Sequence, residues 1–256
     1  MSAGASEYFT EQRVVQLRRE IENLGFVQDE FLASEPDCPV FGFNLTCAFP
    51  FPPEVEQAYL KLAEPLAGLA RGAYTYPLWE THVTLMTFVN FSLYKHPSAA
   101  QVGELRAWMA PIVDVIRPLF EKEGVKPFQL EFQRPVLTRK AVILPVANPS
   151  GEIALIRRRV GQLLENNKGL HAKLSGAGLN VPGIIHSTIM RWEKAPRVSA
   201  RLISGFEKVF AAAVPFTINV HEILFTTEIK PYMRASEIVH RFRLSDLKPF
   251  YGLTSS

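Results

Sequence analysis

The chain has 256 residues, of which 47% are hydrophobic and 21% charged, and its formal net charge is +3. This composition is typical of a globular protein and excludes a wholly disordered one. A membrane span is not expected, because no run of about 18 apolar residues occurs. The slight charge does not predict the concentrated basic face of a double-stranded DNA-binding protein, but it suits a small anionic substrate.

The N-terminus and the cysteines bear on the cellular compartment. The N-terminal residues lack the basic start and apolar block of a secretory signal. The two cysteines, Cys38 and Cys47, do not have the spacing of a metal-binding motif. We therefore expect a cytoplasmic protein with two reduced, structural thiols and without a cofactor.

The first part of the chain alternates predicted helices and strands. Apolar residues at three- and four-residue steps predict a helix over residues 8–24, closed by Gly25. A loop rich in acidic residues and proline leads to a predicted strand over 40–49. An apolar stripe then predicts a helix over 55–69, and residues 74–90 are strand-like.

The second part continues the same alternation. A capping box at Ser98 predicts a helix reaching residue 123, which Pro111 and Pro118 should kink or split. The remaining predicted elements are a hairpin over 128–145, a helix capped by Ser150, a strand-like segment over 183–192, a helix near 198–213, and closing strands over 216–227 and 238–244. Each half thus offers helices and strands in a similar order, which predicts an α+β fold of two lobes, distant copies of each other, around a cleft.

One five-residue word, H-x-T-[LI]-M, occurs once in each half, at residues 82–86 and 186–190. Alternate side chains of a strand share a face. On this basis His82, Thr84 and Met86 should point one way, and so should His186, Thr188 and Met190, while Arg191 should point away from them. Two such strands side by side would bring two imidazoles and two hydroxyls to one cleft.

These groups suit the cleavage of a phosphodiester. Histidine titrates near neutrality, so one ring can take a proton from water while the other protonates the departing oxygen. Threonine hydroxyls can hold the phosphate oxygens. A lone histidine on an apolar strand is more often a hydrogen-bonded core residue, but the matched pair favours a site. A metal site is disfavoured, because neither word carries a Cys, Asp or Glu at ligand spacing. A protein that binds nucleotides without turning them over is the remaining alternative.

The paired words resemble those of the 2H phosphoesterase superfamily, which includes the LigT-like RNA 2′,3′-cyclic phosphodiesterases. The order of elements is similar over about residues 38–246. The resemblance implies a bilobal, pseudo-two-fold LigT-like fold, with two antiparallel-sheet lobes flanked by helices around a central cleft. Residues 1–36 would then be an N-terminal helical extension, and residues 37–256 the two-lobed domain.

The resemblance also implies roles for individual residues. His82 and His186 would be catalytic, with His186 as the base and His82 as the acid, and Thr84 and Thr188 would bind phosphate. The substrate would be a 2′,3′-cyclic phosphate or a related 2′-linked phosphodiester, on an RNA end or a small nucleotide. The reaction would need no metal, and a monomer would carry it out.

Aromatic residues flank both words. Tyr76 and Trp79 precede the first word and Trp192 follows the second, and any of the three could stack on a base at the mouth of the cleft. Aromatic residues in such positions are more often ordinary core or rim residues. Lys230 and Tyr232 lie where a loop could overhang the cleft. His96 has no partner pattern in the sequence and is interpreted as structural or exposed.

Overall fold

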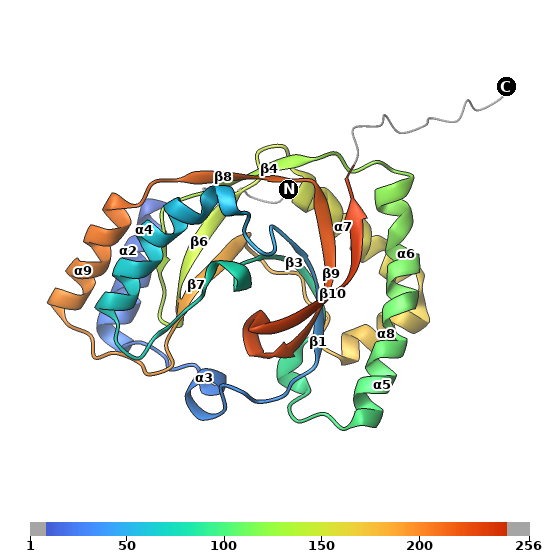
Figure 1. Cartoon of the computed structure of the whole chain (residues 1–256), viewed down its shortest axis with the longest axis horizontal. Helices are drawn as coiled ribbons and strands as arrows, with labels where there is room; N and C mark the ends of the chain where they lie inside the picture. Colours follow the sequence, from blue (N-terminus) through green and yellow to red (C-terminus); the bar gives the residue numbers. More distant parts are fainter. Residues whose placement is uncertain (1–8, 245–256) are drawn as a thin grey trace.

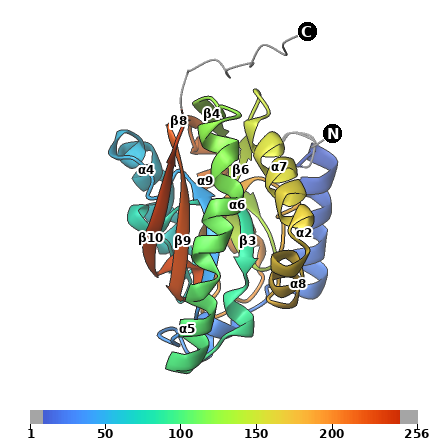
Figure 2. The ribbon, with the colours of Figure 1, turned by 90° about the vertical axis from the view of Figure 1, so that its right-hand side faces the viewer.

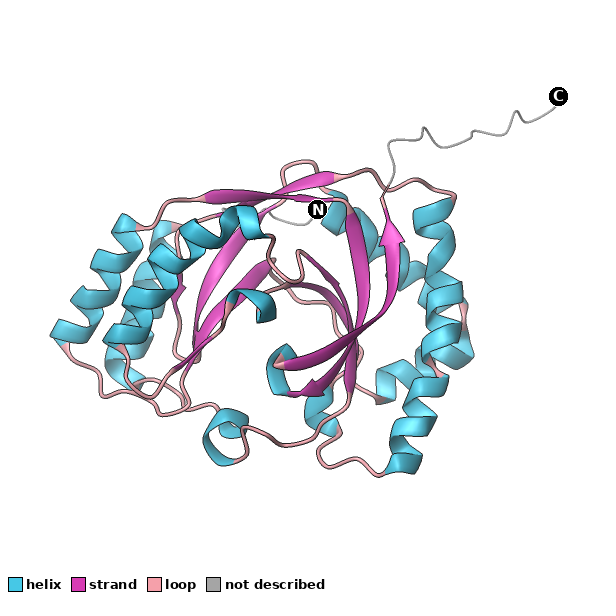
Figure 3. Ribbon diagram, viewed as in Figure 1, coloured by secondary structure: helices cyan, strands magenta, loops and turns pink. Residues whose placement is uncertain are grey.

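Two antiparallel sheets occupy the middle of the molecule, and helices cover their outer sides (Figures 1 and 3). The computed structural model describes residues 9–244. One sheet has four strands in the order β10-β9-β1-β3; the other has six, in the order β2-β7-β6-β4-β8 with β5 paired to β6. The strands are β1 Gly42–Cys47, β2 Tyr74–Thr75, β3 Val83–Val89, β4 Phe128–Phe132, β5 Val136–Leu137, β6 Ala141–Ala147, β7 His186–Arg191, β8 Phe216–Val220, β9 Glu222–Lys230 and β10 Ala235–Arg243.

The predicted α+β, two-lobed fold is confirmed, but each lobe takes strands from both halves of the chain. The four-stranded sheet joins β1 and β3 to the late strands β9 and β10. The predicted strand over 216–227 is divided at His221, because β8 pairs with β4 in one sheet whereas β9 pairs with β1 in the other. The crossing at His221 therefore ties the lobes together.

The helices fall into two groups at opposite ends of the molecule (Figure 1). Helices α2, α4 and α9 lie beside the six-stranded sheet, and α5 to α8 lie beside the four-stranded sheet. Figure 2 shows α6 running across β9 and β10, where Phe120 stacks on Phe242 with ring centroids 4.5 Å apart. The helices are α2 Glu11–Leu24, α3 Glu30–Ser34, α4 Glu56–Leu69, α5 Ala99–Ala107, α6 Met109–Glu121, α7 Glu152–Asn166, α8 Lys168–Gly176 and α9 Ala200–Ala212, with short 3-10 turns at Pro53–Val55, Leu78–Glu80, Phe91–Leu93 and Pro231–Met233.

The predicted helix ends are partly confirmed. Ser98 forms the expected capping box with Gln101, but the long helix divides at Trp108 and not at a proline. Pro111 lies in the first turn of α6, whose backbone N–H groups have no intrahelical partner to lose. Ser150 does not cap α7, which instead begins at Gly151 with a left-handed φ of 82°.

The N-terminal segment is closely joined to the six-stranded sheet. Helix α2 packs against β5. After it, the Val27 amide donates to the Arg139 carbonyl and the Asp29 amide donates to the Trp192 carbonyl, both at 2.7 Å. These bonds lead the chain along the sheet and bring Asp29 to the space between the lobes. Among residues 9–244, no helix has the length and apolarity needed to cross a membrane.

Candidate functional site

A cavity of about 250 Å³ lies between the two sheets, where the edge strand β3 approaches β7. Both histidines and both threonines of the H-x-T words line it. The lining residues are Asn44, Tyr76, His82, Thr84, Thr87, Asn90, Phe91, Asn180, His186, Thr188, Arg191, Glu228, Tyr232 and Met233. The structure therefore brings the four predicted catalytic and phosphate-binding residues to one small space.

Each word contains a β-bulge at the same position. In the β1–β3 ladder Leu45 pairs with Met86 and Thr46 pairs with Thr84, so Leu85 has no partner. In the β6–β7 ladder Val142 pairs with Met190 and Ile143 with Thr188, so Ile189 has none. A bulge inserts one extra residue into a strand and shifts the alternation beyond it.

The bulges correct two predictions made from strict alternation. Met86 and Met190 are buried in the core next to the bulged residues, and do not share the face of the histidines. The residue that directly follows each word, Thr87 in one case and Arg191 in the other, turns back toward the cavity. Arg191 therefore belongs to the site, although alternation placed it on the opposite face.

The two imidazoles have different surroundings. Nδ1 of His82 donates to the Glu80 carbonyl at 2.9 Å. Nδ1 of His186 is buried, and none of the described residues offers it a partner with hydrogen-bond geometry. In both rings Nε2 is then the nitrogen free to meet a substrate.

Burial is the main influence on both histidines. It lowers the pKa of His82, while the bond to the Glu80 carbonyl opposes the fall and Arg191 adds to it. For His186, burial and then Arg191 lower the pKa to about 4, against a smaller opposing effect of the Ile184 carbonyl. Both rings are therefore neutral near pH 7.

Arg191 supplies the positive charge of the cavity. Its Nη1 lies 3.4 Å from Oδ2 of Asp29, and its guanidinium stacks 4.0 Å above the centre of the Tyr232 ring. The Tyr232 hydroxyl donates to the same Asp29 oxygen at 2.6 Å. These contacts fix the planar group in one orientation, whereas its Nε, which is buried, has no partner among the described residues. A fixed guanidinium with an unused donor is well suited to hold a phosphate oxygen.

Glu228 on β9 adds a second titrating group. Its carboxyl accepts from the Met233 amide at 2.9 Å and from Nδ2 of Asn44 at 3.2 Å. Burial nevertheless raises its pKa to about 7, although these bonds and Arg191 lower it. The cavity can therefore offer a protonated carboxyl as a hydrogen-bond donor near neutrality.

Arg157 binds the backbone of the first H-x-T word. From α7, its Nε donates to the Leu85 carbonyl at 2.9 Å and its Nη2 donates to the Thr84 carbonyl at 3.2 Å. Burial lowers its pKa to about 10. These bonds fix the carbonyls at the bulge and, through them, the direction of Thr84.

Comparisons by sequence give no family model and no curated protein that matches the chain. Solved structures do match. TT0787 of Thermus thermophilus is 14% identical, with a TM-score of 0.53 over 79% of this chain and 97% of that one. ATU0111 of Agrobacterium tumefaciens str. C58, a conserved protein of unknown function, is 15% identical, with a TM-score of 0.53 over 89% and 98%. E. coli LigT complexed with 3′-AMP is 12% identical, with a TM-score of 0.46 over 80% and 99%.

This chain therefore shares the fold of TT0787 and ATU0111. At such low identity the likeness concerns the fold alone, and the activity has to be argued from the cavity.

The three predicted base-stacking residues are not brought together. Trp192 is fully buried, with Phe26 at 4.8 Å and Phe206 at 6.0 Å between ring centroids, so its predicted place at the cleft mouth is wrong. Trp79 is 70% exposed and lies outside the lining of the cavity. Tyr76 does line the cavity, but only 2% of it is exposed.

Two aromatic rings reach the cavity from segments outside the words. Phe91 and Tyr232 line it with ring centroids 5.2 Å apart. The sequence indicated Tyr232 through its position in a loop near the cleft, but contained no signal for Phe91. Lys230, the last residue of β9, instead pairs with Asp37 at 2.6 Å.

Proposed function

We propose that the chain is a phosphodiesterase that hydrolyses a 2′,3′-cyclic phosphate, or a related 2′-linked phosphodiester, on an RNA end or a small nucleotide. The observation that carries the proposal is the convergence of His82, Thr84, His186 and Thr188 with Arg191 on one cavity of about 250 Å³. A space of this size suits a phosphate and its sugar.

The reaction needs a base and an acid on opposite sides of phosphorus. His186, whose pKa of about 4 keeps its ring neutral, takes a proton from the attacking water as the new P–O bond forms. His82 protonates the sugar oxygen as the old P–O bond breaks, and the bond from its Nδ1 to the Glu80 carbonyl supports its charged form. An anionic substrate favours that form further, because it adds a negative charge beside a ring that is otherwise neutral.

The remaining groups hold charge. The hydroxyls of Thr84 and Thr188 and the guanidinium of Arg191 can donate to the non-bridging phosphate oxygens, where negative charge increases in the transition state. We propose that these residues replace a metal in this role. Among the described residues, the cavity lining contains no group of three His, Cys, Asp or Glu side chains with donor atoms close enough to share an ion.

A panel of 2′,3′-cyclic nucleotides and 2′,5′-linked dinucleotides tests the proposal. His82→Ala and His186→Ala should each lower turnover by about 10²- to 10⁴-fold, the usual contribution of a general acid or base. His221→Ala, outside the cavity, is the matched control and should retain activity. Near wild-type turnover in either cavity variant would show that the two-histidine mechanism is wrong. Tight binding without any turnover would identify a binding protein instead.

A further inference from the structure

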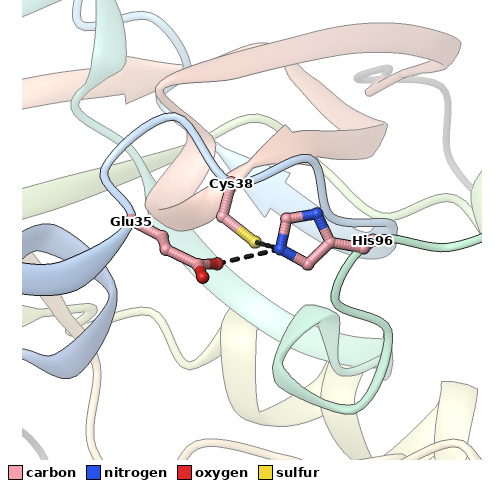
Figure 4. A group of neighbouring side chains, drawn as sticks. All are labelled: Glu35, Cys38 and His96. Atoms are coloured by element: carbon pink, nitrogen blue, oxygen red, sulfur yellow. Dashed lines mark hydrogen bonds and ion pairs between the residues drawn. The ribbon is translucent and has the colours of Figure 1, made fainter.

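A second group of reactive side chains lies outside the cavity. Figure 4 shows Glu35, Cys38 and His96, which come from the loop after α3 and the loop before α5. Nε2 of His96 is 3.5 Å from Sγ of Cys38 and 2.9 Å from Oε2 of Glu35. The three donor atoms lie within 4.8 Å of one another, and among the described residues this is the only such group.

The geometry excludes a nucleophilic triad. In a Cys-His-acid relay, the thiol meets one ring nitrogen and the carboxylate orients the other. Here the sulfur and the carboxylate both approach Nε2, so the ring cannot pass a proton between them. Burial also raises the pKa of the Cys38 thiol, which is the opposite of what an activated thiol needs.

We propose that Glu35, Cys38 and His96 form a binding site for a zinc ion. A tetrahedral zinc ion with bonds of about 2.0 to 2.3 Å separates a sulfur and a nitrogen ligand by roughly 3.5 Å, and Cys38 and His96 already have this separation. The carboxylate oxygen, now 2.9 Å from Nε2, would move a few tenths of an ångström away from the ring, and it lies within 4.8 Å of the sulfur. Thiolate, imidazole and carboxylate together are a typical zinc donor set, and the thiolate disfavours magnesium and calcium.

The backbone holds the site in place. The His96 amide donates to the Pro39 carbonyl at 2.8 Å, and the Cys38 amide donates to the Glu35 carbonyl at 2.9 Å. The side chains of Glu35 and His96 are more than half exposed, so an ion can enter from solvent. On binding, the Cys38 thiol would release its proton to water, and Nε2 of His96 would give up the hydrogen that it donates to Glu35, so that the imidazole binds the ion as its Nδ1–H tautomer. Three protein ligands leave the fourth position to water, which predicts an exchangeable ion.

The bound ion would act as a clamp on the segment that carries α3 and would take no part in the chemistry. Helix α3 runs from Asp29, which contacts Arg191 and Tyr232, to the loop that carries Glu35 and Cys38. An ion shared with His96 would fix this segment to the opposite loop. The clamp is independent of the proposed phosphodiesterase activity, because its ligands lie outside the cavity lining.

Cobalt titration of the tag-free, metal-stripped full chain tests the site. One Co²⁺ per chain should give the near-ultraviolet thiolate-to-cobalt band and the visible bands of a tetrahedral ion, and Zn²⁺ should displace it. Cys38→Ser should abolish the thiolate band. His96→Ala should weaken binding by more than the roughly 10- to 100-fold that loss of an outer-shell partner costs.

Two further variants keep the experiment decisive. Cys47→Ala removes the other thiol and should leave the bands unchanged. Lys95→Gln should tighten binding, because the Lys95 ammonium, held 4.2 Å above the Phe31 ring, is a positive charge close to the proposed ion. Absence of the thiolate band at millimolar Co²⁺, or its persistence in folded Cys38→Ser, would overturn the proposal. Neither result would bear on turnover of a cyclic nucleotide.

Discussion

The two H-x-T words have the same sequence pattern and the same bulge, but they present different groups to the cavity. His82 is held by the Glu80 carbonyl, whereas the buried Nδ1 of His186 finds no such bond among the described residues. After the bulge, one word presents the neutral Thr87 and the other presents the cationic Arg191. A repeated strand therefore fixes two imidazoles in like positions, while the flanking residues make them chemically unequal.

The largest expected effect concerns the roles of the His186 and His82 imidazoles as base and acid. If His186 is the base and His82 the acid, the profile of kcat/KM against pH should be bell-shaped, with its optimum below about 6.5, because both pKa values lie below the ordinary value of 6.5. His186→Ala, about 10²- to 10⁴-fold slower, should lose the low-pH limb and keep the high-pH limb. His82→Ala should do the reverse.

The substrate itself sharpens this comparison. The anion should raise the pKa of both rings, so the profile of kcat should lie at higher pH than that of kcat/KM. If His82→Ala and His186→Ala kept the same limb of the pH profile, the two histidines would be chemically equivalent. The assignment of His186 as base and His82 as acid would then be wrong.

Sequence predicted the strands and the meeting of the words, because a strand and its apolar anchors are local properties. It did not predict the bulges, since the extra residue is defined only against the partner strands β1 and β6. Met86 and Met190 illustrate this, because each directly follows another apolar residue. Two consecutive apolar residues in a strand are compatible with a bulge but do not predict one. The turn of Arg191 into the cavity follows from the bulge, and was missed for the same reason.

Other site residues were missed because they come from segments that are distant in the chain. Asp29 was assigned to an N-terminal extension, yet it pairs with Arg191 across 162 positions. Glu228 follows directly after the predicted strand over 216–227 and was not singled out, and only the contacts with Asn44 and Met233 show that it is buried in the site. Trp192 was misplaced because an aromatic after a motif has no local feature that distinguishes core from rim.

The next effect tests the carboxyl on the wall opposite Arg191. The folded-state pKa of Glu228, about 7, lies above its ordinary value of 4.5. The folded protein therefore binds the proton more tightly, and the resulting stability is present below pH 4.5 and is lost as pH rises through about 7. Relative to Glu228→Gln, the wild type should lose on the order of 3 kcal/mol of unfolding free energy across this window.

Urea unfolding at several pH values measures this difference. The histidines act in the opposite sense, because their lowered pKa values remove stability as pH falls below 6.5, but this contribution is common to both proteins and cancels. Glu237→Gln, on the neighbouring strand β10 and more than half exposed, is the matched control. If the unfolding free energies of the wild type and Glu228→Gln changed in parallel with pH, the Glu228 carboxyl would not be buried as described.

A smaller effect should separate the residues that follow the two bulges. Arg191→Met removes a charged donor, worth about 1.5 to 3 kcal/mol, and should lower kcat/KM by about 10- to 100-fold. Thr87→Val removes a neutral donor and should cost less than about tenfold. Equal losses of kcat/KM in the two variants would show that Thr87 and Arg191 contribute equally. The proposed difference between the two words would then be wrong.

Arg191 also has a structural partner, which requires a control. Asp29→Asn removes the ion pair but keeps the guanidinium, so it should retain most of the activity. Because Arg191 lowers the pKa of His186, Arg191→Met should also move the low-pH limb of the profile to higher pH. A loss of packing alone would not move that limb.

The smallest effect concerns Arg157, which supports only the first word. Arg157→Met should lower kcat by about tenfold and leave KM nearly unchanged, because Thr84 would still be present but less well directed toward the transition state. Arg157→Lys keeps one donor and should recover part of the rate. Arg159→Met, on the same helix but in an exposed pair with Glu123, is the matched control and should behave as wild type. Unchanged kcat in a folded Arg157→Met variant would contradict this role. It would mean that the pairing of β3 with β1 sets the direction of Thr84 without the guanidinium from α7.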